Sequence, residues 1–283
     1  MRTPKALKGA GALLAMVALA AGASACVKSN AGSTADGLKL AAAGKLTVCT
    51  HLPFKPFQVR DTKGAIVGFD VDYMDLVAKK LGLTQTIVDT PFEGIKSGQD
   101  LKIGKCDVAA AGMTITKTRQ QVMDFSVPYF DNTQSLLVKA GQPYKTLADF
   151  KGKKIGGEVG NTGLKFAQNN AAKYGFTVVE YQDTTTLQQA LATNQIQGAM
   201  DDLPIWTVLV AEDKRFTIAT KFATNEQYGY SVAKGANPKL LATVNEVITS
   251  SLKDGSYAKL YTKWMQLPAP SPLVTQGMTP PQD

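Results

Sequence analysis

AAAGMTITKTRQQVMDFSVPYF, residues 109–130, begins as a buried strand of small and apolar residues and continues into a helix. Thr114 and Thr116 follow the strand, and Arg119 comes five residues after Thr114. In open parallel sheets, ligands bind just beyond the carboxyl ends of the strands. The three polar side chains therefore predict a ligand site at this strand end, although an arginine on a helix more often pairs with a surface acid.

Strand-like and helix-like segments alternate around this stretch. KLTVCT at 45–50 and TQTIVDT at 84–90 are β-rich, and GFDVDYMDLVAKKLG at 68–82 has helical apolar spacing, with Asp70 as the predicted N-cap. The alternation starts again with KKIGGEVG at 153–160. This order predicts an α/β fold of two lobes, each a mostly parallel sheet flanked by helices, with two crossings of the chain between the lobes.

The N-terminus has the features of an export signal. Three basic residues precede the apolar run Ala10–Ala21, which ends in the small residues GASAC. This pattern predicts a signal peptide over residues 1–25, and the run is too short to span a membrane. Cys26 follows a box that is similar to a bacterial lipobox, so we expect it to carry lipid; the alternative is an ordinary cleaved signal beside an incidental cysteine.

The remaining boundaries follow from composition. Residues 26–44 are small and polar and predict a flexible tether after the lipidated cysteine, and the proline-rich residues 268–283 predict a disordered tail. The two-lobed reading assigns residues 45–134 and 231–267 to a first lobe, and 135–230 to a second lobe that carries the hinge strands.

Charge and cysteine content limit the function classes. The net charge of +8 falls to 8 − 3 = +5 without the three basic residues of the signal peptide, and the lysines are scattered. A nucleic-acid site would need a basic patch, so we exclude that partner. Cys49 and Cys106 are the two other cysteines, and either a disulfide or two buried thiols would suit an exported protein.

Five motifs in a specific order carry a family resemblance. They are LTVCTHLPFKPF at 46–57, GFDVDYMDLVAKKLG at 68–82, CDVAAAGMTITKTR at 106–119, DFSVPYF at 124–130 and LADFKGKKIGGEVGNTG at 147–163. Together they resemble the family 3 solute-binding proteins of polar amino-acid ABC transporters, over residues 45–267. The resemblance implies the two-lobed periplasmic-binding-protein type II fold, a hinge of two crossing strands, and no catalysis.

The resemblance also implies how the two ends of an amino acid are bound. Arg119 occupies the position that binds the α-carboxylate, a role for which a guanidinium is suited because it offers two parallel hydrogen bonds. Thr114 can assist at the carboxylate or at the ammonium, and Gly112 can offer its carbonyl to the ammonium. Asn161 and Thr162, at the start of a helix, can bind the carboxylate from the second lobe. Asp202 matches the acid that binds the α-ammonium.

The side-chain end of the implied site leaves two ligand classes open. Phe54 and Phe92 match aromatic positions that enclose the ligand, although core packing is an equal alternative for each. His51, the only histidine, stands where close relatives carry an aspartate. Glu158 and Asp201 are acidic and favour a cationic side chain, whereas the imidazole leaves a glutamine-like ligand open.

The leading hypothesis is therefore a binding protein held outside the cytoplasmic membrane by its lipid, acting as a monomer, that delivers a free amino acid to a membrane permease. We expect no cofactor and no bound metal. The competing hypothesis is a dehydratase of small carboxylates on the same fold, in which Glu158 would act as a general acid if its pKa were raised. Cys49 and His51 lie two residues apart but have no evident third member of a triad. A third hypothesis, a signalling ligand-sensor, is disfavoured because no pattern in this sequence supports a fused transmembrane or catalytic domain.

Overall fold

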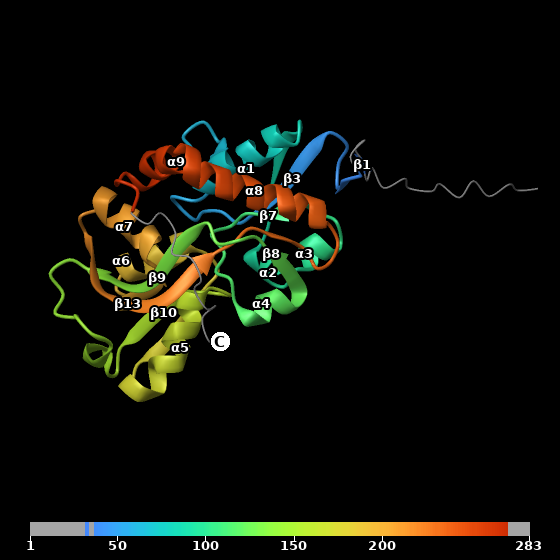
Figure 1. Ribbon diagram of the computed structural model, residues 1–283. Coiled ribbons are helices and arrows are strands. Elements are labelled where there is room, and N and C mark those ends of the chain that lie inside the picture. The colour runs from blue at the N-terminus through green and yellow to red at the C-terminus, as the bar shows by residue number, and fades with distance from the viewer. Residues whose placement is uncertain (1–31, 34–36, 271–283) are drawn as a thin grey trace, which may run out of the picture.

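A computed structural model describes residues 32–33 and 37–270, and these form two lobes, each built around a five-stranded sheet (Figure 1). The predicted signal peptide, Cys26 and most of the predicted tail lie outside the described residues. Figure 1 shows helices α1, α8 and α9 at the top of the molecule and α5 at the bottom, with the strands between them.

The first lobe has the strand order β6-β3-β7-β14-β8. Strands β6, β3 and β7 are parallel, whereas β14 is antiparallel to both of its neighbours. The strands are β3 (Lys45–Thr50), β6 (Thr84–Asp89), β7 (Val108–Ala109), β8 (Met123–Phe125) and β14 (Ser231–Ala233). The helices are α1 (Phe69–Lys80), α2 (Phe92–Lys96), α3 (Gln99–Lys102), α4 (Lys117–Val122), α8 (Pro238–Asp254) and α9 (Ser256–Met265).

The second lobe has the strand order β11-β10-β12-β9-β13. Here too three strands are parallel, and β9 is antiparallel to β12 and β13. The strands are β9 (Phe130–Lys139), β10 (Lys154–Glu158), β11 (Thr177–Tyr181), β12 (Gly198–Asp202) and β13 (Phe216–Tyr228). The helices are the 3-10 turn η1 (Leu147–Phe150), α5 (Thr162–Tyr174), α6 (Thr184–Ala192) and α7 (Leu203–Glu212).

The two-lobed α/β architecture with mostly parallel sheets is confirmed, because four of the five strands in each sheet run in the same direction and one, β14 or β9, runs against its neighbours. The parallel part of each sheet comes from strands joined by helical crossovers, as the sequence pattern predicts. The antiparallel part comes from strands that enter from the other lobe. The chain leaves the first lobe along β9 and returns along β13 into β14, and these two crossing strands pair with each other.

Local sequence explains why α1 packs where it does. Phe69, Tyr73 and Val77 recur at helical spacing and are fully buried against α8 and α9. Asp70 is not the N-cap that the sequence predicts: Gly68 precedes the helix, and Asp70 lies buried in its first turn. Its carboxylate instead accepts hydrogen bonds from distant groups, which no local pattern reveals.

The segment before Lys45 packs more closely on the first lobe than a free tether would. Strand β2 (Lys39–Leu40) pairs with β1 (Gly32–Ser33), and the side chains of Leu38 and Leu40 are buried. The amide of Ala41 donates to Asp107 Oδ1 at 2.6 Å. Two leucines bury enough apolar surface to hold this short segment against the sheet.

A disulfide joins Cys49 on β3 to Cys106, two residues before β7, with the two Cα atoms 5.6 Å apart. The bond therefore links β3 to the segment that leads into its parallel neighbour β7. A short hairpin, β4 (Val59–Arg60) with β5 (Ile66–Val67), completes the lobe. Among the described residues, no helix has the length and apolar character that crossing a bilayer requires.

Candidate functional site

Thr114, Thr116 and Arg119 form one local structure at the end of β7. The Thr116 hydroxyl accepts the backbone N–H of Arg119 at 3.2 Å, so Thr116 is the N-cap of α4. This cap places Arg119 in the first turn of the helix. The guanidinium then folds back, and its Nη1 donates to the carbonyl of Thr114 at 2.6 Å. The two threonines thus start the helix and hold its arginine.

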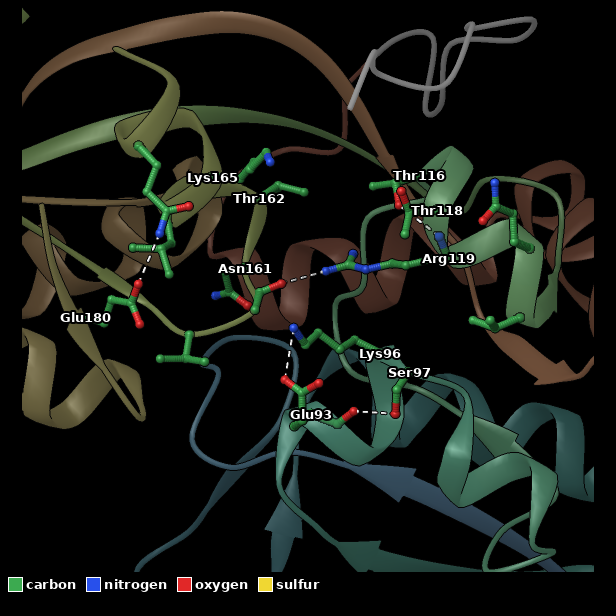
Figure 2. A pocket seen from close by; sticks show the side chains of 16 residues that line it. Glu93, Lys96, Ser97, Thr116, Thr118, Arg119, Asn161, Thr162, Lys165 and Glu180 are labelled. Carbon is green, nitrogen blue, oxygen red and sulfur yellow. Dashed lines mark hydrogen bonds and ion pairs between the residues drawn. The ribbon is translucent and has the colours of Figure 1, made fainter. Parts of the chain in front are cut away.

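The Arg119 side chain extends from the first lobe to the second. Its Nη2 donates to the carbonyl of Gly160 at 3.0 Å, and the guanidinium lies 5.4 Å from the centre of the Phe92 ring. Figure 2 shows the side chain pointing from α4 toward the loop that carries Asn161. Arg119 also forms part of the wall of an interlobe cavity of about 630 Å³. A buried guanidinium stacked on an aromatic ring is well placed to bind a planar anion.

The N-terminus of α5 faces Arg119 from the second lobe. Asn161 is the N-cap residue and Thr162 the first residue of the helix. The Asn161 side chain donates to Asp201 Oδ1 at 3.4 Å, so it also contacts one of the predicted acids. The Thr162 hydroxyl lies 3.4 Å from the Thr114 hydroxyl. The two predicted anion-binding segments therefore meet across the interface between the lobes.

Two further contacts join the lobes away from this point. The Thr184 hydroxyl at the start of α6 donates to the carbonyl of Pro53 at 2.7 Å. On the surface, Lys55 Nζ lies 2.5 Å from Glu212 Oε1. Because contacts between the lobes occur on several sides of the site, the structure is a closed form in which most of the predicted ligand residues are buried, whereas His51, Asn161 and Thr162 are partly exposed.

Asp202 ends β12 and is fully enclosed. It accepts hydrogen bonds from the Tyr228 hydroxyl and from the Gln134 side-chain amide. Burial, followed by the charge of Glu226, raises the pKa of Asp202 to about 7, although the two hydrogen bonds oppose this shift. A carboxylate in such a place is costly to ionise alone and is stabilised by a cation beside it.

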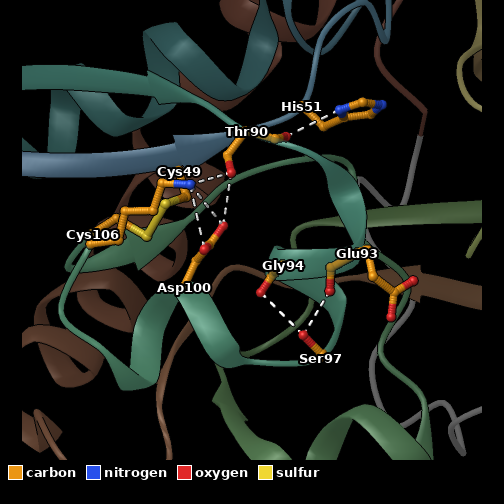
Figure 3. Close-up of polar contacts among 9 residues, drawn as sticks. Cys49, His51, Thr90, Glu93, Gly94, Ser97, Asp100 and Cys106 are labelled. Atoms are coloured by element: carbon orange, nitrogen blue, oxygen red, sulfur yellow. Dashed lines mark hydrogen bonds and ion pairs between the residues drawn. A yellow bond between two sulfur atoms is a disulfide. The ribbon is translucent and has the colours of Figure 1, made fainter.

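His51, Glu158 and Asp201 form an acidic group at the other end of the site. His51 Nδ1 lies 3.1 Å from the carbonyl of Thr90, and because that oxygen can only accept, Nδ1 carries the proton. Figure 3 shows this hydrogen bond between His51 and Thr90, with the Cys49–Cys106 disulfide beyond Thr90. The other ring nitrogen, Nε2, lies 3.5 Å from Glu158 Oε1.

The pKa values in this group are shifted by burial and by mutual charge. Burial alone would lower the pKa of His51, but Glu158 and the Thr90 carbonyl raise it above its usual value. Burial raises the pKa of Glu158, and burial together with Asp202 and Glu158 raises that of Asp201 well above its usual range. Glu158 Oε2 and Asp201 Oδ2 are buried and have no hydrogen-bond partner. Because burying an oxygen acceptor without a partner is energetically costly, a hydrogen-bond donor or a cation placed beside these two oxygens would stabilise the site.

The two predicted aromatic residues lie in different surroundings. The Phe92 ring centre lies 5.4 Å from the guanidinium of Arg119 and 6.2 Å from the centre of the His51 ring, so Phe92 lies between these two side chains. Phe54 lies against Gly112, where an added Cβ would meet its ring at 2.7 Å. The Gly112 amide donates to Asp70 at 2.8 Å.

Four residues that sequence reasoning did not single out lie among the predicted ones. Glu226, Asn132, Gln134 and Tyr228 come from the crossing strands β13 and β9. Glu226 and Asn132 are directly opposite each other in the strand register. A pattern in the sequence could have indicated these residues. Asn132 and Gln134 are two residues apart, as are Glu226 and Tyr228, and residues two apart in a strand lie on the same face of the sheet. Among the described residues, no group of metal-ligating side chains is present.

The chain is similar to known proteins over most of its length. Residues 46–267 match the model of the bacterial extracellular solute-binding proteins, family 3. The putative ABC transporter arginine-binding protein 2 of Escherichia coli is 28% identical over 234 residues, which cover 81% of this chain and 94% of the relative.

Solved structures extend the comparison. An ancestral arginine-binding protein bound to arginine has a TM-score of 0.73 and 36% identity, over 78% of this chain and 98% of its own. An ancestral arginine-binding protein bound to glutamine has the same TM-score and identity. AncCDT-1, an ancestral amino acid-binding protein described as a precursor of cyclohexadienyl dehydratase, has a TM-score of 0.71 and 31% identity, over 78% of this chain and 95% of its own. With a match over most of its length and a two-lobed structure, the chain belongs to family 3 of the bacterial extracellular solute-binding proteins.

Proposed function

We propose that this protein is the extracytoplasmic binding component of an amino-acid ABC importer, and that it holds a basic L-amino acid between its lobes. The observation that carries the proposal is the buried charge of the site. Four acids are buried there, Glu158, Asp201, Asp202 and Glu226, with Arg119 as the cation at the opposite end. A ligand that brings one carboxylate and two cationic groups would complement this distribution.

The α-carboxylate is assigned to Arg119, with Asn161 and the backbone N–H groups that begin α5 at Thr162. Three facts support this: the guanidinium is buried, it stacks on Phe92, and it faces the N-terminus of α5. The hydroxyls of Thr114 and Thr162 lie between the two ends of the proposed ligand and can serve either its carboxylate or its ammonium. The α-ammonium is assigned to Asp202 and to the carbonyl of Gly112. In support, the Asp202 carboxylate is buried and its pKa is raised by burial, so a neighbouring cation would stabilise its charged form.

The ligand side chain is assigned to His51, Phe54, Phe92, Glu158 and Asp201. Two carboxylate oxygens without partners, Glu158 Oε2 and Asp201 Oδ2, suit the several N–H groups of a guanidinium. The similarity to arginine-binding proteins supports the same assignment. A glutamine-like ligand is the alternative, supported by the likeness to an ancestral protein bound to glutamine and by His51, which compensates one of the acids when protonated.

A panel of the twenty amino acids and ornithine, measured by thermal unfolding, separates these ligands. A ligand at 100 times its Kd adds about 2.7 kcal/mol to the free energy of unfolding. We expect arginine, lysine or ornithine to raise the melting temperature and glutamine to have a smaller effect. Stabilisation by glutamine or glutamate without any effect of the basic amino acids would contradict the proposal.

Single substitutions test whether Glu158 and Asp201 cause the proposed preference for a basic amino acid. Glu158→Gln and Asp201→Asn each keep the shape of the side chain and remove its charge, so both should weaken arginine binding by about 10- to 100-fold and change glutamine binding little. The matched control is Glu246→Gln, an exposed glutamate on α8 that pairs with Lys80 on the surface. Equal affinities for arginine in all three variants would place the ligand side chain elsewhere.

A dehydratase of small carboxylates is the second candidate. Its support is the raised pKa of Glu158, which would keep a proton available for a leaving hydroxyl, and the likeness to a precursor of cyclohexadienyl dehydratase. We favour a binding protein without catalysis or cofactor. Mass spectrometry of candidate ligands recovered after incubation decides this, because a binding protein returns its ligand unchanged.

The cellular setting completes the proposal. The signal peptide over residues 1–25 would direct export, and a lipid on Cys26 would hold the protein at the outer face of the cytoplasmic membrane. There the protein would act as a monomer and deliver its free amino acid to the membrane permease of the importer. Residues 45–134 with 231–267 and residues 135–230 would be the two lobes that close on the ligand.

A further inference from the structure

A buried carboxylate from the hinge, Glu226 on β13, lies where the two lobes meet. One of its oxygens, Oε2, accepts four hydrogen bonds from side chains on three separate segments of the chain. The donors are Thr114 Oγ1 at 3.1 Å, Thr162 Oγ1 at 2.8 Å, Asn132 Nδ2 at 3.1 Å and Gln134 Nε2 at 2.9 Å. Only 3% of the Glu226 surface is exposed. Glu226 therefore organises groups from both lobes.

The proton count at the two threonines determines what they can offer a ligand. A hydroxyl has one proton to donate and two lone pairs that accept. Thr114 and Thr162 both donate to Glu226, and the Thr162 hydroxyl also accepts from Gln134 Nε2 at 3.1 Å, so each hydroxyl can present only a remaining lone pair to a bound molecule. Lone pairs accept from an ammonium and repel a carboxylate. The contacts of Glu226 thus favour the ammonium as the partner of these two hydroxyls.

The amides of Asn132 and Gln134 are oriented in the same way. Both point their NH₂ groups at Glu226, since the reverse orientation would put their oxygens against its carboxylate. The Gln134 amide also donates to Asp202, so it joins the two carboxylates. The charge of Glu226 contributes to the raised pKa of Asp202. The two acids thus form one negative region beside the threonine hydroxyls.

We propose that Glu226 is a positioning and specificity residue: it aims the lone pairs of Thr114 and Thr162 at the ligand's α-ammonium and adds its charge to that of Asp202. The inference rests on the proposed function and deepens it, because it identifies what makes the site select α-amino acids over carboxylates that lack the amino group. The ligand carboxylate is left to the Arg119 guanidinium and to the backbone N–H groups at the start of α5, none of which donates to Glu226.

The test compares two ligands that differ only in the α-amino group, L-arginine and 5-guanidinopentanoate. Calorimetry gives the Kd of each for the unaltered protein and for Glu226→Gln, which keeps the size of the side chain and removes its charge. Loss of one charged hydrogen-bonding partner corresponds to about a 10- to 100-fold weaker binding of arginine. We expect the Kd of 5-guanidinopentanoate to change less than about threefold by the same reasoning.

Two further variants separate positioning from folding. Thr162→Val removes a hydroxyl that donates to Glu226, and the combined variant should lose less arginine affinity than the sum of the single losses, because both act on one network. Glu246→Gln, on the surface of α8, is the control for an exposed glutamate. Circular dichroism and thermal unfolding of each variant without ligand establish that it is folded.

Each outcome decides between the two proposals. A selective loss of arginine affinity in Glu226→Gln supports the inference. Equal weakening of both ligands, or an unchanged ratio of their Kd values, overturns it and leaves the proposed function standing. Failure of the unaltered protein to bind arginine or any other amino acid overturns the proposed function and the inference with it.

Discussion

The backbone amide of Gly112 donates to Asp70 Oδ2 at 2.8 Å, although 42 residues separate the two in the chain. Asp70 comes from the first turn of α1, and its other oxygen accepts from the Tyr230 hydroxyl at 3.2 Å. The buried carboxylate of Asp70 therefore fixes the backbone at Gly112, two residues before Thr114. The Phe54 ring packs against the same glycine.

Gly112→Ala should disrupt this arrangement. Gly112 has a φ of 55°, a left-handed conformation that disfavours a side chain, and an added Cβ would lie 2.7 Å from the Phe54 ring. We expect a loss of about 2–4 kcal/mol in the free energy of unfolding, from backbone strain plus overpacking, and weaker amino-acid binding. Chemical denaturation and calorimetry measure the two effects.

The matched control is Gly152→Ala, at a φ of 70° with open space around the site of the new Cβ. It should cost only the backbone term, about 1–2 kcal/mol, and leave binding unchanged. Equal losses of stability and affinity in the two variants would show that the contact with Phe54 has no role.

Arg119→Ala should weaken amino-acid binding by about 30- to 4,000-fold, because it leaves the ligand carboxylate buried without its charged partner. Its control is Arg215→Ala, an exposed arginine that pairs with Asp213. Calorimetry on both proteins checks the expectation. Unaltered affinity in Arg119→Ala would remove the arginine from the site.

Ligand binding should weaken as the pH falls below about 7. In the unliganded protein the pKa of Asp202 is about 7, so at lower pH a proton competes with the ligand's ammonium for the carboxylate. Affinity should therefore fall by up to about tenfold per pH unit below that value, with release of a proton on binding. His51, whose pKa is also raised, adds to the effect when it becomes charged.

Calorimetry in two buffers of different ionisation enthalpy measures the proton release. His51→Gln should keep the part due to Asp202, and Asp202→Asn should remove that part along with much of the affinity. A ligand affinity that is constant between pH 8 and pH 5.5 would contradict the assignment of Asp202.

Removal of the Cys49–Cys106 disulfide should lower the free energy of unfolding by about 4 kcal/mol, the loop-entropy value for a separation of 57 residues. Replacement of both cysteines by serine, compared by urea unfolding with the intact protein, measures the change. Both proteins should carry Cys26→Ser so that no third thiol interferes. We expect the selectivity between arginine and glutamine to be unchanged; a reversal would mean that the bond shapes the site around His51.

Cys26→Ser tests the membrane anchor by itself. If Cys26 carries lipid, the variant should move from the membrane fraction to the soluble fraction of the cell envelope or to the medium, as fractionation and immunoblotting would reveal. Retention of the variant in the membrane, or an unmodified Cys26 in the mass spectrum of the mature protein, would contradict lipidation.

The sequence was informative where function depends on neighbours in the chain. The Thr116 cap and Arg119 lie three residues apart, so the helix start and its arginine could be predicted together. Asp70 could not be assigned correctly, because its partner is 42 residues away and an aspartate near a helix start normally caps it. Glu226 was missed for a related reason: a polar residue on a strand usually faces solvent, and only the pairing of β13 with β9 buries it.

The position of β14 in the first sheet has a consequence for the order of folding. This strand comes from residues 231–233 and lies between β7 and β8, which were made more than 100 residues earlier. During synthesis the sheet of the first lobe therefore lacks its strand β14 until residues 231–233 have been made. The second lobe is one continuous segment, so it can fold before that point. The lobe that begins the chain is the last to be completed, and α8 and α9 cover it only when nearly the whole protein has been made.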